Sequence, residues 1–340
     1  MYSTVSTPIN DFLVNYSNEK KIRLHMPGHK GRFFDNFAEH LTENIDLYKY
    51  DITEIVGADS LYEADGIIRE SEKNAEKLFR SGTTVYSASG STLCIQTMLY
   101  LMKCEQREVF YTGNPHRAFF NACKLLNIAP KEISDCKFTG RKAVYITSPD
   151  YFGNITDIIK YKSDNVKILV DNAHGAHLAF YDDSRHPLHN GADLVCDSAH
   201  KMLPVLTGGA YLHSSEPAMV KTLKDAMAVF GTTSPSYLIL QSLDLCNVYL
   251  DKYVRDDIKR TSKLLGDNKK RDCYHMVVKY IPEILEYVTP EFVNDEYMIL
   301  LFSPLNTDEE INFLLNLLKK YDSNIDTGNL KLKIPEYNQI

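Results

Sequence analysis

Short apolar runs alternate with stretches of helical spacing through the middle of this chain. Runs of apolar, β-branched and aromatic residues with the length of strands lie at 83–88, 108–112, 143–147, 166–170 and 193–196. Apolar residues with helical spacing lie near 70–79, 93–102 and 118–127, and a further helix is expected from about residue 155. Strands that alternate with helices predict an α/β protein with a mostly parallel, doubly wound sheet.

The pattern changes after this alternating region. We expect a strand at the margin of the sheet at 208–212, a helix at 216–230 and one long helix from 237 to about 265. The polar stretch 266–270 is the best domain boundary. Strand-like runs at 275–280 and 297–302, and a helix opened by a capping box at 307–310, then predict a small α+β unit. The predicted division is an N-terminal segment 1–45 with a short helix, a large domain 46–265 and a small C-terminal domain 266–340.

Composition and charge narrow the class of protein. The 340 residues are 44% hydrophobic and 24% charged, with a formal net charge of −7. An acidic chain disfavours nucleic acid as the main partner, because phosphate binding needs a basic face. No apolar run approaches the ~18 residues of a membrane span, and the pattern of the first residues leads us to expect no secretory signal. Seven cysteines without a C-x-x-C pair, Cys94, Cys104 and Cys196 among them, predict buried, reduced thiols in a cytoplasmic protein.

An acid and a lysine follow two of the predicted strands. The strand 166–170 leads into Asp171, and the strand 193–196 leads into Ser198, His200 and Lys201. Ligands bind at the carboxyl ends of strands in an open parallel sheet, so Asp171 and Lys201 are expected to face one crevice. This pair is what pyridoxal 5′-phosphate (PLP) requires, since a lysine holds its aldehyde and an acid keeps its ring nitrogen protonated. The alternative is that both are ordinary surface charges.

Two further strand-to-helix turns carry polar residues. The first predicted strand runs into a hydroxyl-rich turn with Gly90, Ser91 and Thr92 at the start of a helix. Free N–H groups and hydroxyls at a helix start bind phosphate, although such residues also serve as simple caps. His116 occupies a similar turn, either as a capping residue or as an imidazole stacked on a flat ring.

Seven motifs occur in one order: HMPGHKGR at 25–32, SASGST at 87–92, NPHRA at 114–118, TSPDYFGN at 147–154, VDNAHGAH at 170–177, DSAHKMLPVLTGGAYLH at 197–213 and TTSPSY at 232–237. This set resembles the bacterial ornithine/lysine/arginine decarboxylase family. The resemblance implies fold type I, the aspartate-aminotransferase-like fold of PLP-dependent enzymes.

The resemblance also implies roles for individual residues. Lys201 holds PLP as a Schiff base, Asp171 pairs with the pyridinium nitrogen, and His116 stacks on the ring. The implied cofactor-binding residues are Gly90, Ser91, Thr92, His116, Asp171, His174, Ser198, His200, Lys201 and Thr233. Of these, Thr233 reaches the phosphate of the neighbouring subunit in the family dimer.

The implied activity is decarboxylation of arginine, lysine or ornithine to the amine and CO₂, by a homodimer or an assembly of dimers. Two alternatives stay open: another PLP reaction, as in an aminotransferase or lyase, or PLP binding without catalysis. The absence of arginine after Arg271 weighs against an aminotransferase. Relative to the family, Asn172 stands where Glu is frequent, and the portion after about residue 265 is expected to be shortened.

Two other chemistries fit poorly. Ser198 and Lys201 match a serine-hydrolase S-x-x-K pattern, and 163–165 matches its S-D-N element, but their order is reversed and no K-T-G follows. His174 and His177 with Asp171 resemble metal ligands, but helical zinc sites prefer histidines at i and i+4. We therefore expect no metal.

Overall fold

The computed structural model describes residues 5–18, 47–133, 140–321 and 323. The loop HMPGHKGR at 25–32 lies outside these residues. The helix predicted near the N-terminus is α1, Pro8–Asn18. Within the described segment 47–66, a short 3₁₀-helix, η2 (Leu47–Lys49), precedes α2 (Ile67–Phe79).

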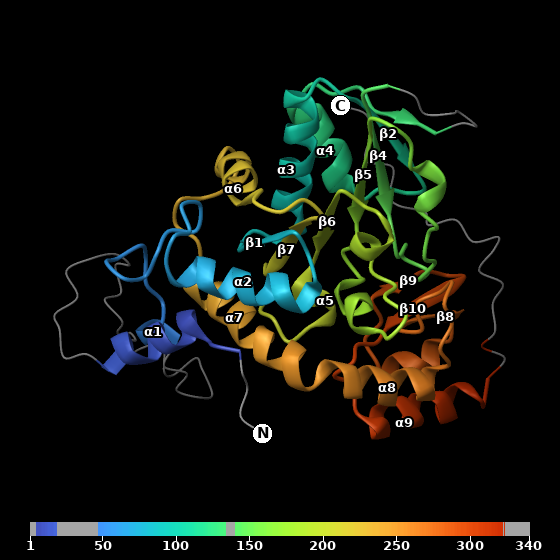
Figure 1. The fold of residues 1–340 in the computed structure, drawn as a ribbon. Coiled ribbons are helices and arrows are strands. Elements are labelled where there is room, and N and C mark those ends of the chain that lie inside the picture. Colours follow the sequence, from blue (N-terminus) through green and yellow to red (C-terminus); the bar gives the residue numbers. More distant parts are fainter. Residues whose placement is uncertain (1–4, 19–46, 134–139, 322, 324–340) are drawn as a thin grey trace.

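A seven-stranded mixed sheet forms the centre of the molecule (Figure 1). Its strands stand in the order β1-β7-β6-β5-β4-β2-β3. Their bounds are Thr83–Ser87 (β1), Glu108–Thr112 (β2), Lys131–Glu132 (β3), Lys142–Thr147 (β4), Val166–Asp171 (β5), Leu194–Asp197 (β6) and Ala210–Ser214 (β7). The strands from β6 to β3 pair in parallel, and this confirms the predicted mostly parallel α/β sheet.

The position predicted for β7 was wrong. The strand lies inside the sheet and pairs antiparallel with both β1 and β6. All its residues are buried, so an edge position would have left an apolar strand with one side of its backbone unpaired. The edge falls instead to β1, whose neighbour β7 comes from much later in the chain.

Helices cover both faces of the sheet (Figure 1). One face packs on α3 (Gly90–Cys104), α4 (Arg117–Leu125) and α6 (Val220–Ala228), through residues such as Val85 and Leu212. The adjacent residues Tyr86 and Tyr211 point to the opposite face, because successive strand side chains alternate. That face is covered by α2 (Ile67–Phe79), α7 (Tyr237–Lys252) and the 3₁₀-helix η4 (Ala176–Phe180).

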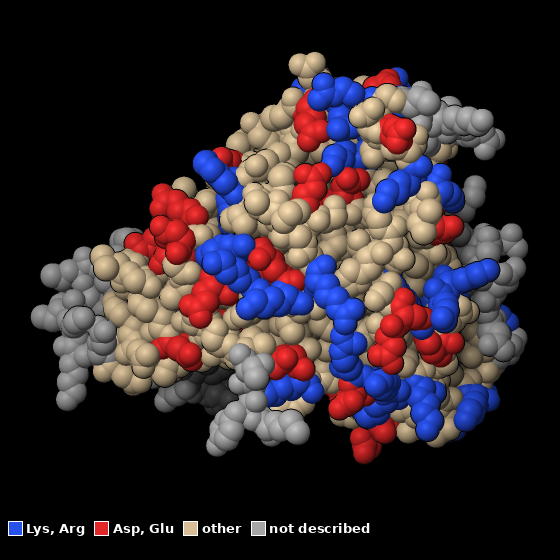
Figure 2. Space-filling view, viewed as in Figure 1, with Lys and Arg blue, Asp and Glu red and all other residues tan. Residues whose placement is uncertain are grey.

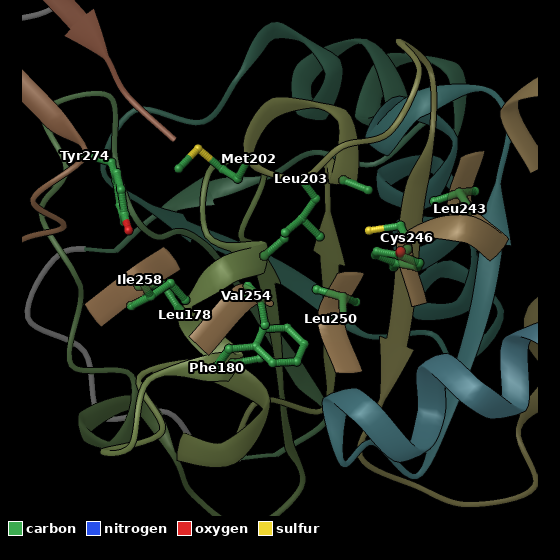
Figure 3. Packing of buried hydrophobic residues seen from close by; sticks show 14 of the residues in the cluster. Leu178, Phe180, Met202, Leu203, Leu243, Cys246, Leu250, Val254, Ile258 and Tyr274 are labelled. Carbon is green, nitrogen blue, oxygen red and sulfur yellow. The ribbon is translucent and has the colours of Figure 1, made fainter. Parts of the chain in front are cut away.

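The long helix predicted from 237 to 265 is two helices. A break at Tyr253, whose φ is −121°, separates α7 from α8, Val254–Leu265. Figure 3 shows the consequence: Val254 and Ile258 of α8 turn onto Leu178 and Phe180 of η4, in the same apolar cluster as Leu250 of α7. Burial of these side chains explains the break, since a straight helix would carry α8 away from the cluster.

The helix expected from residue 155 is also absent from the described segment 154–165, which holds only the short 3₁₀-helix η3, Ile159–Tyr161. Backbone amides at its start have other partners. Ile155 N donates to Lys270 O at 2.9 Å, and Thr156 N donates to Ser148 Oγ at 2.9 Å. These tertiary hydrogen bonds replace the helical ladder that local spacing suggested.

The C-terminal region matches the predicted elements. An antiparallel sheet in the order β8-β10-β9 contains His275–Lys279 (β8), Phe292–Val293 (β9) and Tyr297–Leu301 (β10). The helix α9, Asp308–Leu318, begins with the predicted capping box between Thr307 and Glu310. The domain boundary at 266–270 stays a prediction. Tyr274, which follows this boundary, belongs to the same apolar cluster as residues of α7 and α8.

The charge distribution, the helices and the cysteines can be compared with the expectations from composition, and one cysteine differs. Acidic and basic side chains are interspersed on the face in Figure 2. None of the described helices combines the length and apolar character needed to span a bilayer. Cys94 and Cys196 are buried free thiols as predicted, whereas Cys104 is exposed, because it ends α3 on the solvent side.

A buried carboxylate fastens α1 to the rest of the fold. The Ile9 and Asn10 amides both donate to Asp244 Oδ2 at 3.0 Å, and Ser71 Oγ donates to Oδ1 at 2.5 Å. Burial raises the pKa of Asp244 to about 6, although the hydrogen bonds oppose this rise. The carboxylate thus satisfies amides at the start of a helix, which have no partners within it.

Asp244→Asn should flatten part of the pH dependence of stability. Because the fold raises this pKa above its ordinary value of 3.8, the stabilisation is complete below about pH 4 and is lost as pH rises through about 6. Between pH 5 and pH 7 the loss is on the order of 1 kcal/mol in the parent and absent from the variant. Urea unfolding of both proteins at pH 5 and pH 7 measures it. An equal change in the two proteins would contradict the assignment.

Candidate active site

The carboxyl ends of β5 and β6 form the base of the candidate site. Parallel pairing sets Asp171 opposite Cys196. Asp171 is 2% exposed and accepts hydrogen bonds from the Tyr145 hydroxyl at 3.0 Å, the Ala173 amide at 3.3 Å and the Cys196 thiol at 3.6 Å. Among the described residues no Lys, Arg or His lies within ion-pair distance of it. Asp171 is therefore a buried carboxylate whose described hydrogen-bond donors are all neutral groups.

Lys201 lies on the short helix α5, Ala199–Met202, directly after β6. Its Nζ is 2.9 Å from Nε2 of His174. Burial lowers the pKa of Lys201, while the charges of Asp171 and Glu291 act in the opposite direction. Asp171 and Lys201, which follow neighbouring strands, are therefore close enough to interact electrostatically. That the two bind one ligand stays a prediction.

His116 caps a helix beside this site. It is the N-cap residue of α4, and its Nδ1 accepts from the Ala118 amide at 3.2 Å. Partial burial lowers the pKa of His116; Asp171 raises it, and Lys201 lowers it further. The capping role is present in the structure, and stacking on a ligand ring stays a prediction.

The predicted phosphate turn meets the turn before α5. Ser198 Oγ donates to Ser91 Oγ at 2.8 Å, which joins the first turn of α3 to the base of the lysine helix. Gly90 has φ +70°, and a Cβ there would find nothing within 4 Å. Thr92, exposed in the same turn, completes a hydroxyl-rich rim around open space at a helix N-terminus.

Two further predicted cofactor-binding residues, His200 and Thr233, differ in whether the described structure holds them by a hydrogen bond. His200 Nδ1 is 3.0 Å from the Gly209 carbonyl, which holds the ring between α5 and β7. Thr233 is exposed between α6 and α7, and the described residues show no hydrogen bond from it to the others of the site. Its contact with a neighbouring subunit stays a prediction.

Three residues of the site carried no signal in the sequence. Tyr145 lies in the middle of β4, and only the register of β4 on β5 brings its hydroxyl to Asp171. Glu291 and His275 come from the C-terminal region and approach the site through tertiary packing. The charge of Glu291 affects both Lys201 and Tyr151, and His275 bonds His174 at 3.3 Å.

The histidines first weighed as metal ligands have other partners. His174 contacts Lys201, whereas the buried His177 Nε2 is 3.1 Å from Asp272 Oδ1. The structure brings together another group, His186, Asp197 and His213, all fully buried. The Leu188 amide donates to His186 Nδ1 at 3.3 Å, so Nε2 of that ring carries its hydrogen toward Asp197 at 3.0 Å. A hydrogen-bond network accounts for this group.

The fold and site together define the class. A mostly parallel seven-stranded sheet, covered by helices and with a lysine and an acid at neighbouring strand ends, is the architecture of fold type I, the aspartate-aminotransferase-like fold. The family profile "Orn/Lys/Arg decarboxylase, major domain" matches residues 7–134 and 126–299. The chain belongs to this family.

Individual relatives agree with this assignment. The chain is 27% identical to the uncharacterized protein YaaO of Bacillus subtilis, over 74% of this chain and 58% of that protein. It is 26% identical to an arginine decarboxylase of Bacillus cereus, over 93% of this chain and 78% of that enzyme. In structure it resembles lysine decarboxylase A from Pseudomonas aeruginosa, with a TM-score of 0.76, 15% identity and coverage of 92% and 59% of the two chains.

Tyr145→Phe should destabilise the protein by about 2 kcal/mol, because a buried carboxylate loses a donor. Burial and the neighbouring Asp171 raise the pKa of Tyr145 well above its ordinary value, so the hydroxyl stays protonated and donates. Tyr62→Phe is the control, since its buried hydroxyl has no partner among the described residues. Urea unfolding compares them, and equal losses in both variants would refute the claim.

Proposed function

We propose that this protein binds PLP and decarboxylates a basic amino acid (arginine, lysine or ornithine) to the corresponding amine and CO₂. One observation carries the proposal: Asp171 is a buried carboxylate that makes no ion pair among the described residues, and its charge acts at longer range on Lys201, whose pKa burial lowers. A buried unpaired charge is costly, and a cationic ring nitrogen would offset that cost. Membership in the family supports the reaction, and relatives named arginine decarboxylase support the class of substrate.

The donor set fits PLP in several places. The hydroxyls of Ser91 and Ser198, with the open space at Gly90, suit a phosphate at the start of α3. Asp171 suits a ring nitrogen, and Lys201 suits the aldehyde. Each part of PLP, the phosphate, the ring nitrogen and the aldehyde, thus has a protein group of suitable chemistry.

When bound, PLP supplies an electron sink for the pair of electrons left at the substrate α-carbon when CO₂ departs. Asp171 keeps a proton at the ring nitrogen, since an opposite charge within ~4–6 Å raises the pKa of a base by one to three units. Burial favours the neutral amine of Lys201, the form that bonds a carbonyl carbon. His174 Nε2 lies 2.9 Å from the Lys201 Nζ, and this hydrogen bond holds the amine in place.

Glu291 is suited to the cationic end of a basic amino acid. It is exposed in the loop before β9, and no ion pair to it is found among the described residues. Its charge raises the pKa of Lys201, so the two groups are close enough to interact electrostatically. Ammonium or guanidinium groups pair with such a carboxylate.

We also propose a homodimer, or an assembly of dimers, located in the cytoplasm. The exposed Thr233 supports the first part, because it makes no described contact within its own site and is available to another subunit. Free thiols at all six described cysteines support the second.

Asp171→Asn and Lys201→Ala test the proposal. Purified protein with added PLP should show a visible-edge absorbance band of lysine-bound cofactor and release CO₂ from one of the three amino acids. Lys201→Ala should lose the band, and Asp171→Asn should retain PLP while turnover falls roughly a hundredfold. Absence of the band from the parent protein would end the proposal, and PLP binding without CO₂ release would reduce it to a cofactor-binding protein.

Glu291→Gln should raise KM for the basic substrate roughly five-fold with little change in kcat, because it removes one partly solvated ion pair. Glu296→Gln is the matched control, since Glu296 is exposed beside the same small sheet without an effect on Lys201. Steady-state kinetics with each amino acid distinguishes the two. An unchanged KM in Glu291→Gln would remove this residue from substrate binding.

A further inference from the structure

A chain of buried polar groups connects Lys201 with the C-terminal region. Lys201 Nζ is 2.9 Å from His174 Nε2, and His174 Nδ1 is 3.3 Å from His275 Nε2. His275 Nδ1 is in turn 3.0 Å from Asp272 Oδ2. His174, His275 and Asp272 are each at most 4% exposed, so water does not substitute for these contacts.

Asp272, the last group in this series, determines which atom donates in each of its hydrogen bonds. Both Asp272 oxygens only accept while the carboxylate is ionised. Burial raises the pKa of Asp272, but His177 and His275 together outweigh burial, and the net shift is downward. His275 then donates through Nδ1, and a ring with one N–H accepts through Nε2. That acceptor requires His174 to carry its hydrogen on Nδ1, and the lone pair of His174 Nε2 faces Lys201.

We infer that Asp272 and His275 are positioning residues that fix the tautomer of His174 and so hold the amine of Lys201 against a permanent acceptor. The inference rests on the proposed function only for its consequence, which is that the amine meets the PLP aldehyde in one orientation. Asp272 and His275 lie at the start of β8, so the reactive lysine is oriented by a segment outside the large sheet.

Other charged and titratable groups also act on Lys201 and His174, and the variants proposed below do not change them. Asp171, Glu291 and Cys196 act on the amine of Lys201. His116 acts on His174, and the ring of Tyr151 lies 5.2 Å from it. A variant at residue 275 or 272 leaves all five in place.

The test measures the pKa of the Lys201 amine without cofactor or turnover. The full chain is treated with hydroxylamine to remove any bound PLP and labelled with trace acetic anhydride across a pH series. Peptide mass spectrometry then gives the apparent pKa of Lys201. A shift in this value is independent of whether the protein decarboxylates amino acids, so failure of this inference is distinguishable from failure of the proposed function.

His275→Asn retains a donor near Asp272 but removes the acceptor for His174. The ammonium form of Lys201 then requires a buried, unpaired N–H on His174, so the apparent pKa should fall by about one unit. Asp272→Asn should act in the same direction, because an amide N–H facing His275 reverses the tautomers. His275→Gln offers an oxygen at the position of Nε2 and should restore the parent value.

The matched control is His177→Asn. His177 bonds the same carboxylate and is equally buried, but it lies off the path to Lys201. It should lose stability in thermal unfolding as His275→Asn does, and leave the pKa of Lys201 unchanged. An unchanged pKa in His275→Asn, or an equal shift in His177→Asn, would overturn the inference.

A measurement on the parent protein remains decisive if a buried variant does not fold. ¹⁵N spectra of histidine-labelled protein, with the signal of His174 assigned by His174→Gln, should show the hydrogen on Nδ1. A hydrogen on Nε2 would overturn the inference.

Discussion

Parallel pairing of β5 with β6 is the constraint on which the site depends. The pairing sets Asp171 beside Cys196, and the chain reaches Ser198 and Lys201 directly after β6 ends. Because β4 pairs with the other side of β5, the Tyr145 hydroxyl covers the carboxylate. An acid and an amine are thus held at neighbouring strand ends by backbone hydrogen bonds. Neither side chain could hold that position by itself, since burial opposes the charge of each.

Two buried aspartates, each between two histidines, extend outward from this base. Asp197 bonds His186 and His213, whose remaining nitrogens face the Leu188 amide and the Thr84 hydroxyl, so that network is complete within the fold. Asp272 bonds His177 and His275, but the free nitrogen of His275 continues to His174. The same arrangement therefore forms a closed network around Asp197 and a connection to Lys201 around Asp272.

The C-terminal region is joined to the large sheet by two kinds of contact, apolar packing and buried hydrogen bonds. Leu250, Val254, Ile258 and Tyr274 belong to one apolar cluster with Leu178 and Phe180, and burial of these side chains stabilises the contact (Figure 3). Apolar contacts are not directional, however, and leave the exact placement open. The hydrogen bonds of Asp272 and His275 specify it, because a buried polar group that misses its partner is costly.

The sequence by itself determined the alternation of strands and helices, the acid and lysine at strand ends, and the capping box at Thr307, because these depend on local spacing and on turn chemistry. Tertiary structure alone decided the rest. The internal position of β7, the break at Tyr253 and the loss of a helix after Ile155 follow from burial and from partners far along the chain. Tyr145, Glu291 and His275 entered the site in the same way. No local pattern marks such residues, since their role depends on strand register and on packing between segments more than a hundred residues apart in the case of His275 and His174.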